Sequence, residues 1–194
     1  KDSMSGSFLD KDVPPTLISF AIAPIKKQDV ITPEFKEAGN PVYLFGATDE
    51  SADSLKATWE AFHTLCEEGK VKASWAVERG IGEAVMKMSF GNKVGATITM
   101  DEQALFDYAY GSFVVEATED LDFAAAEVIG QTIDKAEVVF NGTAFCIDEL
   151  QKINSQKFCK VYPDRGIEGG STRKSEPAKR VIKYAGTPVE QPIA

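Results

Sequence analysis

The segment Ser51 to Glu68 constrains the fold of this chain more than any other. Its apolar residues recur at helical spacing, Ser51 or Asp53 can cap its start, and Gly69 ends the run. The pattern predicts an amphipathic helix, whose apolar stripe must be buried against another element. Short apolar runs typical of strands flank it, at Val42 to Gly46 and at Val71 to Ala76. This order favours a fold that mixes helices with a sheet.

The rest of the sequence interleaves helices and strands in the same way. A second helix is predicted over Gly80 to Phe90 and a third from about Asp148 into Ser155, while Asp122 to Glu127 is expected to form one or two helical turns. Alternating or β-branched residues predict further short strands over 95–100, 113–117, 129–133, 137–140 and 143–147. Because several strands are adjacent and short, we predict an α+β fold, a mixed sheet with helices packed on it.

A further strand is predicted over Thr16 to Ile25. Apolar side chains occupy both of its faces, so we expect it to be a central strand of the sheet. The preceding Asp10 to Pro15 is expected to be an extended linker, since paired prolines disfavour helix. Beyond Pro163 the residues are polar and glycine-rich without a hydrophobic period, which predicts a tail.

Composition excludes several classes of partner. The 194 residues are 43% hydrophobic and 26% charged, with a formal net charge of -9 and a pI near 4.7. An acidic surface disfavours nucleic acid, and no apolar run approaches the ~20 residues of a membrane span, so neither partner is expected. The three cysteines lack metal-ligand spacing. We therefore predict free thiols, a cytoplasmic location and no metal site.

The first eight residues, Lys1 to Phe8, are dense in groups that contact ligands. Lys1, Ser3 and Ser5 are candidates for binding phosphate or nucleotide, and Asp2 is a candidate for holding a metal or orienting the lysine. The alternative is a frayed polar terminus. Because the motif begins abruptly, we expect an upstream domain to complete it, which would make this chain a fragment of a longer protein.

A second candidate site is the turn Glu78-Arg79-Gly80, which lies between a predicted strand and a predicted helix. Backbone dipoles at a helix start favour anions, so phosphate binding there and an ordinary capping turn are equally good interpretations. Gly166 to Lys174 lacks the phosphate-loop core, and a linker is the better interpretation. The single histidine, His63, has no partner at ligand spacing and is interpreted as a helix-surface residue. No catalytic residue is assigned.

Several segments, taken together, resemble phosphoribosylformylglycinamidine synthase, a family of purine-pathway enzymes. They follow the order of that family over about residues 1 to 150. The segments are Lys1-Asp2-Ser3-Met4-Ser5, Thr16 to Ile25, Val42 to Ala47, Gly80 to Met88, Phe90 to Ala96, Leu105-Phe106 and Gly111 to Glu116.

The resemblance implies the C-terminal domain of the second half of the synthetase core, a domain shared with aminoimidazole ribonucleotide synthetase. Such a domain would have three layers, α/β/α, with partial ferredoxin-like topology. It would span residues 16–155, after an interdomain motif and linker at 1–15 and before a tail at 156–194 that leads to a glutaminase domain.

The same resemblance implies an activity for the complete enzyme. It would use ATP, magnesium and glutamine-derived ammonia to convert formylglycinamide ribonucleotide into the amidine. Its upstream nucleotide-binding module and its glutaminase domain would be the partners of this domain within one chain. The domain alone is expected to be inactive and to bind no cofactor tightly.

One segment departs from the family. Many members carry an Asp-containing loop that ends in Asp-Gly-Gly. In the corresponding segment of this chain, Ser74 to Gly80, only Gly80 and one acidic residue, Glu78, remain, and Arg79 is added. The change alters the electrostatics for metal and phosphate, so we expect a structural or auxiliary half rather than the catalytic one. A non-catalytic scaffold and a domain of another enzyme of the superfamily, such as a selenophosphate or thiamine-phosphate enzyme, remain alternatives.

Overall fold

The computed structural model describes residues 2–46, 49 and 51–157. The chain divides into two units, Lys1–Gln156 and Lys157–Ala194. Nearly all of the second unit lies outside the described residues, so the tail and the linker toward a glutaminase domain stay predictions. The first unit contains a two-stranded sheet and a seven-stranded sheet.

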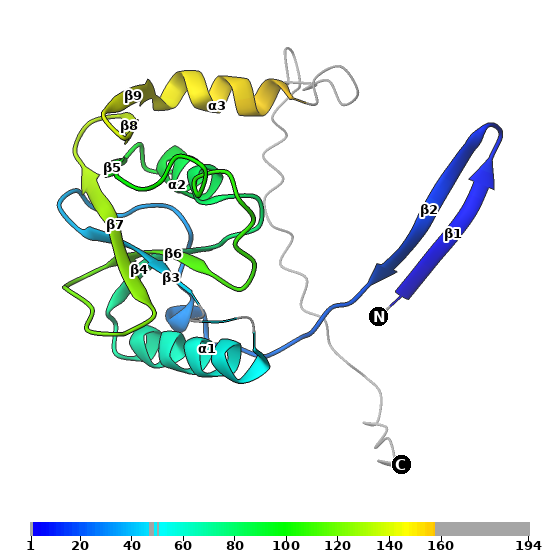
Figure 1. Ribbon diagram of the computed structural model, residues 1–194, viewed down its shortest axis with the longest axis horizontal. Helices are drawn as coiled ribbons and strands as arrows, with labels where there is room; N and C mark the ends of the chain where they lie inside the picture. The colour runs from blue at the N-terminus through cyan, green and yellow to red at the C-terminus, as the bar shows by residue number, and fades with distance from the viewer. Residues whose placement is uncertain (1, 47–48, 50, 158–194) are drawn as a thin grey trace, which may run out of the picture. The chain divides into compact units, whose positions relative to one another are not determined.

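The seven-stranded sheet is mixed and carries three helices (Figure 1). Its strands are β3 (Pro41–Phe45), β4 (Val71–Ala76), β5 (Gly95–Ile98), β6 (Phe113–Ala117), β7 (Ala126–Ile133), β8 (Glu137–Phe140) and β9 (Thr143–Cys146). The helices are α1 (Ala52–Glu67), α2 (Ile81–Phe90) and α3 (Ile147–Gln156), and a short 3-10 turn, η1, covers Lys27–Asp29. The predicted α+β class is confirmed.

The strand order, β4-β6-β3-β7-β5-β8-β9, contains the predicted partial ferredoxin-like topology. Strands β3 and β4 are joined through α1, and β6 lies between them, antiparallel to both. Strand β7 pairs antiparallel with the other side of β3. These four strands reproduce the split βαβ arrangement, and the single parallel pair, β5 with β8, lies in the remaining part of the sheet.

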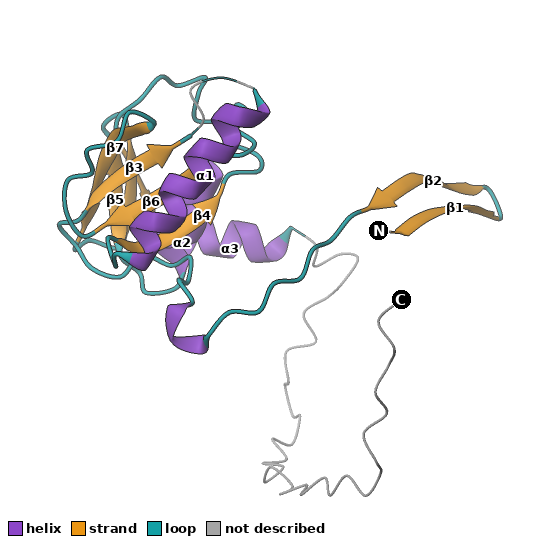
Figure 2. Ribbon diagram, turned by 90° about the horizontal axis from the view of Figure 1, so that it is seen from below, coloured by secondary structure: helices purple, strands orange, loops and turns teal. Residues whose placement is uncertain are grey.

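Helix α1 packs on one face of the sheet and supplies the first helical layer (Figure 2). The Ser51 hydroxyl accepts a hydrogen bond from Ser54 N at 3.1 Å, which confirms the predicted N-cap. Phe62 of α1 stacks on Phe113 of β6 with a centroid distance of 4.3 Å. Phe45 of β3 also contacts Phe62, at 5.7 Å between ring centroids. Aromatic packing therefore fixes α1 to the centre of the sheet.

Helix α2 packs on the opposite face together with α3, which completes the predicted three layers. Its stripe of Ile81, Ala84, Val85 and Met88 is buried, as the helical spacing predicted. The stripe meets Val42, Ala73, Val114 and Ile98 of four strands in the larger hydrophobic core. Ile147, the first residue of α3, is fully buried in the same core.

A buried carboxylate joins the sheet to the segment before β3. Glu116 of β6 is fully buried and accepts hydrogen bonds from Lys36 N at 2.7 Å, Glu37 N at 3.2 Å and Asn40 Nδ2 at 2.6 Å. The hydroxyl of Thr132 on β7 accepts from Asn40 N at 2.9 Å and donates to the Glu37 carbonyl at 2.7 Å. Side chains of the sheet thus satisfy the polar backbone of residues 36–40.

Two sequence predictions are wrong. Thr16 to Ile25 is not a central strand: β2 (Lys11–Ile18) pairs only with β1 (Asp2–Phe8) as an antiparallel hairpin, and it runs through the expected linker. Phe20 and Ile22 are 68% and 89% exposed. Residues 122–127 form no helix either, because a turn at 124–125 leads into β7, where Ala126 pairs with Phe45.

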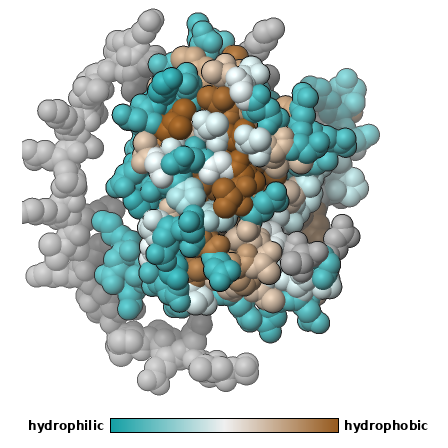
Figure 3. All heavy atoms as spheres, turned by 60° about the vertical axis from the view of Figure 1, so that its left-hand side comes forward, coloured by the Kyte–Doolittle hydropathy of each residue, from teal (hydrophilic) through white to brown (hydrophobic). Residues whose placement is uncertain are grey.

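Among the described residues, no helix packs on part of the sheet face on the α1 side. The cluster beneath α1 draws on β3, β4 and β6 and includes no residue of β5, β8 or β9. Figure 3, which brings the side of β7 forward, shows hydrophobic residues gathered in the middle of that view. Val128 of β7 is among the exposed apolar residues of the chain.

None of the three helices in the described part of the chain has the length and apolar character of a membrane span.

Candidate functional site

The connection between β4 and α2 lies beside a cleft, to whose lining it contributes Arg79. Val77 is buried, and its N–H donates to the Ser112 carbonyl at 2.9 Å. Glu78 and Arg79 follow with exposed side chains. Gly80 has φ 140° and ψ 155°, and α2 starts at the next residue. The structure therefore brings the predicted residues Glu78, Arg79 and Gly80 together at a helix start, with both charged side chains in solvent.

The loop of residues 101–106 covers the first turn of α2. The Leu105 carbonyl accepts a hydrogen bond from Gly82 N at 2.9 Å, and a Cβ at Gly80 would lie 2.7 Å from the same oxygen. Asp101 shapes this loop, since its Oδ1 accepts from Gln103 N at 2.9 Å and from Ala104 N at 3.2 Å. One of the amide groups that an anion would use at this helix start is thus already paired within the chain.

The hairpin between β8 and β9 supplies the second wall of the cleft. Asn141 and Gly142 form its two-residue turn with φ values of 50° and 86°, which is typical of a type I′ turn. The Asn141 side chain accepts from Met100 N at 3.1 Å and donates to the Met100 carbonyl at 2.9 Å. The side-chain amide of Asn141 thus fixes the hairpin to the segment that follows β5.

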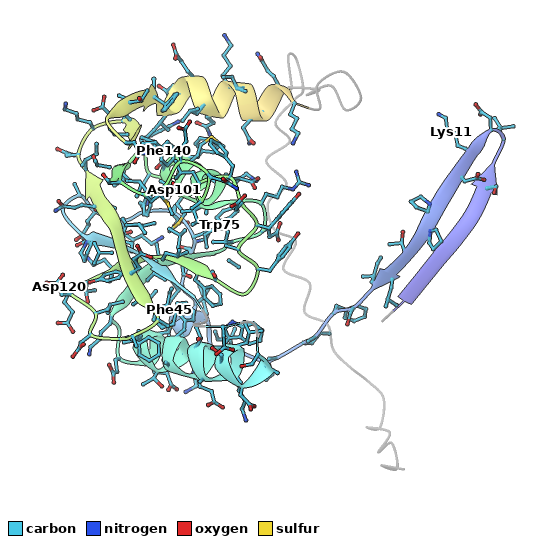
Figure 4. All side chains as sticks on the ribbon, viewed as in Figure 1. Lys11, Phe45, Trp75, Asp101, Asp120 and Phe140 are labelled. Atoms are coloured by element: carbon cyan, nitrogen blue, oxygen red, sulfur yellow. The ribbon has the colours of Figure 1, made fainter. Side chains whose placement is uncertain are left out.

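The cleft has a volume of about 620 Å³ and is mainly apolar. Aromatic side chains of Phe106, Phe140 and Phe145 line it together with Met86, Leu105 and Leu150. Phe140 and Phe145 lie 6.3 Å apart between ring centroids. Figure 4 places Phe140, Asp101 and Trp75 on the α2 side of the sheet, while Phe45 lies on the α1 side.

Charged groups stand at the rim of the cleft. Arg79 and Glu102 line it without being buried. Glu83 also lines it and pairs with Lys87, with 2.7 Å between Oε1 and Nζ, and Lys87 lies 5.6 Å from the centroid of the Trp75 ring. Apolar walls with a few polar groups at the rim suit a small amphiphilic ligand, and Arg79 is the cation there that can meet an acidic group.

The remaining predicted residues lie in other parts of the chain. Asp2, Ser3 and Ser5 belong to β1, and their proposed contact with phosphate stays a prediction. Lys1 lies outside the described residues. His63 is exposed on α1, with Nδ1 3.5 Å from Glu67 Oε2, as expected for a helix-surface histidine. Within residues 2–46, 49 and 51–157, no three His, Cys, Asp or Glu side chains gather as a metal site.

A second hollow, of about 760 Å³, lies beside α1 and β4. It is lined by Ile31, His63, Cys66 and Val71 among others. The most nucleophilic residue type in it is a cysteine, but burial raises the pKa of the Cys66 thiol to about 11. At neutral pH that thiol is protonated and unreactive, so this hollow offers less chemistry than the cleft beside Arg79.

Sequence reasoning missed the aromatic wall of the cleft. Phe140 of β8 and Phe145 of β9 lie on either side of the Asn-Gly turn, and Leu150 belongs to α3, the element after β9. Their alternation within short strands predicts which residues share a face, but not that a loop from residues 101–106 leaves a space beside them. The available signal was the position of the aromatic residues in the two short strands joined by an Asn-Gly pair, which predicts a hairpin.

Comparisons with known proteins give one consistent result. No family model and no curated protein sequence matches the chain. Solved structures do: Thermotoga maritima PurL complexed with AMPPCP aligns with a TM-score of 0.54 and 17% identity over 65% of this chain. Phosphoribosylformylglycinamidine synthase II from the same organism aligns at 0.52 and 16% over 65%, and PurLQS at 0.54 and 15% over 65%.

The aligned part spans 28% of each of these three longer chains. At such identities the likeness establishes the fold alone. It confirms, at that level, the family resemblance that the sequence predicted. The seven-stranded sheet and its helices share the fold of the aligned part of these PurL structures.

Proposed function

We propose that this chain is a domain of an ATP-dependent ligase of the phosphoribosylformylglycinamidine synthase type. The complete enzyme would convert formylglycinamide ribonucleotide into the amidine with glutamine-derived ammonia. The observation that carries the proposal is the shared fold over 65% of this chain, to which the segments of the sequence resemblance add support. T. maritima PurL has been solved with AMPPCP, ATP, ADP and FGAR. These ligands are the nucleotides and the substrate that the proposed reaction requires.

In this proposal the domain forms one wall of an interdomain cleft. The apolar surface beside Phe140 and the guanidinium of Arg79 would face a substrate that other modules hold. Magnesium and the triphosphate are assigned to an upstream nucleotide-binding module, because the described residues bring together no metal-ligand cluster and Gly82 N is already paired with Leu105 O. Bound ATP would supply the phosphoryl group that activates the amide oxygen of the substrate.

Exposed apolar residues support the proposed partner module. Leu17, Phe20 and Ile22 follow one another along β2 and the segment after it, and each is well exposed. A two-stranded hairpin is marginally stable in water unless it packs against something else. A docked upstream module would supply that packing. A downstream glutaminase domain and a cytoplasmic location are part of the same proposal and follow from the family resemblance.

A second role, that of a scaffold without contact to the reacting groups, is favoured by the closed start of α2. The Leu105 carbonyl occupies the position from which an anion would meet Gly82 N. In that case Glu78 and Arg79 would only solubilise the turn. The two roles predict different effects of removing the Arg79 guanidinium.

The activity is tested on the complete natural polypeptide that carries this chain. It is incubated with formylglycinamide ribonucleotide, ATP, magnesium and glutamine, and the products are measured by mass spectrometry. The amidine and ADP are the expected products; ATP hydrolysis that does not respond to this substrate would contradict the proposal. The 194-residue chain alone is expected to give no turnover.

Arg79→Ala in the complete polypeptide separates the wall from the scaffold. A wall role predicts a KM increase of about tenfold with little change in melting temperature, because one charge-assisted contact is lost. A scaffold role predicts unchanged kinetics. Lys56→Ala, which removes an exposed cation on α1 that does not line the cleft, is the matched control. The double change Lys1→Ala and Asp2→Ala applies the same test to the predicted terminal motif.

A further inference from the structure

The loop that covers the start of α2 continues into a surface of exposed aromatic side chains. We call residues 103–111 the aromatic loop. Phe106, Tyr108 and Tyr110 in it are 72%, 68% and 71% exposed. Single exposed apolar residues are common, whereas several aromatic side chains side by side on one short segment are typical of interaction sites.

Contacts at both ends hold the aromatic loop in place. Leu105 is buried, and its carbonyl accepts from Gly82 N at 2.9 Å. Ala109 packs against the core on the α2 side. At the far end, Trp59 Nε1 donates to the Gly111 carbonyl at 3.0 Å. Because Leu105 is buried and Ala109 packs on the core, while residues 106–108 and 110 are exposed, the fold directs the three aromatic rings outward.

Two of the rings are already stacked. Tyr108 and Tyr110 have ring centroids 5.4 Å apart and an interplanar angle of 11°. A partner that packs on this pair meets rings whose mutual arrangement exists before binding, so little side-chain entropy is lost on association. The pair presents a flat π surface rather than a closed pocket.

The charge around the loop selects among ligands. Asp107 lies between two of the aromatic residues, and Asp101 and Glu102 directly precede the loop. Within residues 101–111 every charged side chain is a carboxylate, and the cation that lines the adjoining cleft beside Phe106 is Arg79. At the tyrosine pair, Asp107 and the carboxylates before the loop repel phosphates, which disfavours nucleotides there, and they repel a second copy of the same loop. They attract cations.

Among cations, the guanidinium group matches both features. It is planar and stacks on tyrosine rings, and it forms two parallel hydrogen bonds to a carboxylate such as Asp107. We propose that the aromatic loop is a docking surface for an arginine-bearing polypeptide segment. This inference does not depend on the ligase activity, since Asp107, Tyr108 and Tyr110, which carry it, do not line the cleft.

The proposal is tested by titrating the 194-residue chain with a synthetic peptide of three Arg-Gly-Gly repeats, using amide chemical shifts and calorimetry. Binding is expected to perturb residues 103–111. Tyr108→Ala with Tyr110→Ala is expected to weaken it about tenfold, since two exposed cation–π contacts are lost. Asp107→Asn should weaken binding about threefold through loss of one carboxylate. Ile22→Ala, which removes an exposed apolar side chain elsewhere, should leave it unchanged.

Two controls define failure. A peptide of three Lys-Gly-Gly repeats has the same charge without planar groups, and equal affinity for it would overturn the proposal in favour of unspecific charge attraction. Equal binding by the double tyrosine variant would overturn it as well, and circular dichroism confirms that this variant is folded. Shifts at the loop produced by AMP but not by the arginine peptide would assign the surface to nucleobases instead.

Discussion

The Glu116 carboxylate accepts a hydrogen bond from the Lys36 backbone N–H at 2.7 Å, across 80 positions of sequence. The carboxylate on β6 thus provides hydrogen-bond acceptors for the backbone of the segment before β3, which a neighbouring strand would otherwise provide. It also accepts from Asn40 Nδ2 at 2.6 Å, so removing it leaves several donors without an acceptor.

Glu116→Ala is therefore expected to lower the free energy of unfolding by about 3 kcal/mol, measured by urea denaturation. Glu116→Gln keeps the shape and one acceptor oxygen, and should cost about half as much. Glu119→Ala, whose side chain is 58% exposed, serves as the control and should change stability by less than about 0.5 kcal/mol. Equal stability of Glu116→Ala and the control would show that the buried carboxylate is not structural.

The Glu34 carboxylate gives a pH dependence. Hydrogen bonds from Lys36 Nζ at 2.7 Å and from the Thr32 hydroxyl at 2.6 Å lower its pKa from 4.5 to about 2. Since the folded pKa is below the unfolded one, this stabilisation is complete above pH 4.5 and is lost as the pH falls through about 2. A carboxyl titration followed by NMR should find the low midpoint.

Lys36→Met should raise the Glu34 pKa toward 4.5, because the strongest donor is removed. Lys56→Met breaks the exposed contact between Lys56 and Glu60 and should leave the Glu34 midpoint where it is. A Glu34 midpoint near 4.5 in the unaltered chain would refute the ion pair in solution.

Gly80 and Gly69 are expected to respond differently to substitution by alanine. Both have positive φ, 140° and 71°, but a Cβ at Gly69 would meet nothing within 4 Å whereas one at Gly80 would lie 2.7 Å from Leu105 O. Gly69→Ala is expected to cost about 1 kcal/mol of unfolding free energy from φ alone. Gly80→Ala should cost about 2 kcal/mol more, because φ 140° with ψ 155° is a conformation that essentially only glycine adopts and because the covering loop must shift. Thermal denaturation of both variants measures the difference, and equal losses would contradict the close approach of the loop.

The two described cysteines should differ in reactivity. Burial raises the pKa of Cys66 to about 11, while Cys146 is exposed on β9. In a Cys159→Ser background, Ellman's reagent at pH 8 is expected to modify Cys146 at least about tenfold faster than Cys66. The Cys66 rate should rise as the pH approaches 11, where its thiolate forms. Simultaneous labelling of both thiols at pH 8 would indicate that α1 opens readily.

Local patterns predicted most elements of the seven-stranded sheet. Helix α1 begins after Ser51 and β4 covers Val71–Ala76, as expected, because capping and alternation are determined by neighbouring residues. The Thr16 to Ile25 segment failed for a physical reason. A run with apolar residues on both faces is typical of a strand that is buried on both faces. The sequence does not show whether the segment belongs to the main sheet or to a separate hairpin.

Long-range relationships were beyond sequence reasoning. Three consecutive alanines at 124–126 favour helix, but pairing of Ala126 with Phe45 makes the last of them part of β7. Glu116 sits in an apolar run and gives no sign that its partners lie near residue 36. The turn at Glu78 to Gly80 was found from its place between strand and helix, whereas the loop that closes over it comes from residues 101–106.

The strand order also determines when the sheet can form. Each neighbouring pair of the seven-stranded sheet includes β6 or a strand that follows it, since β3, β4 and β5 do not pair with one another. Before Phe113 is synthesised, the helices α1 and α2 and the β1–β2 hairpin can therefore form their hydrogen bonds, but no strand of the seven-stranded sheet can pair with another. The apolar stripes of α1 and α2 cannot pack on a paired sheet until β6 has been synthesised. During this interval the nascent chain most needs protection from aggregation.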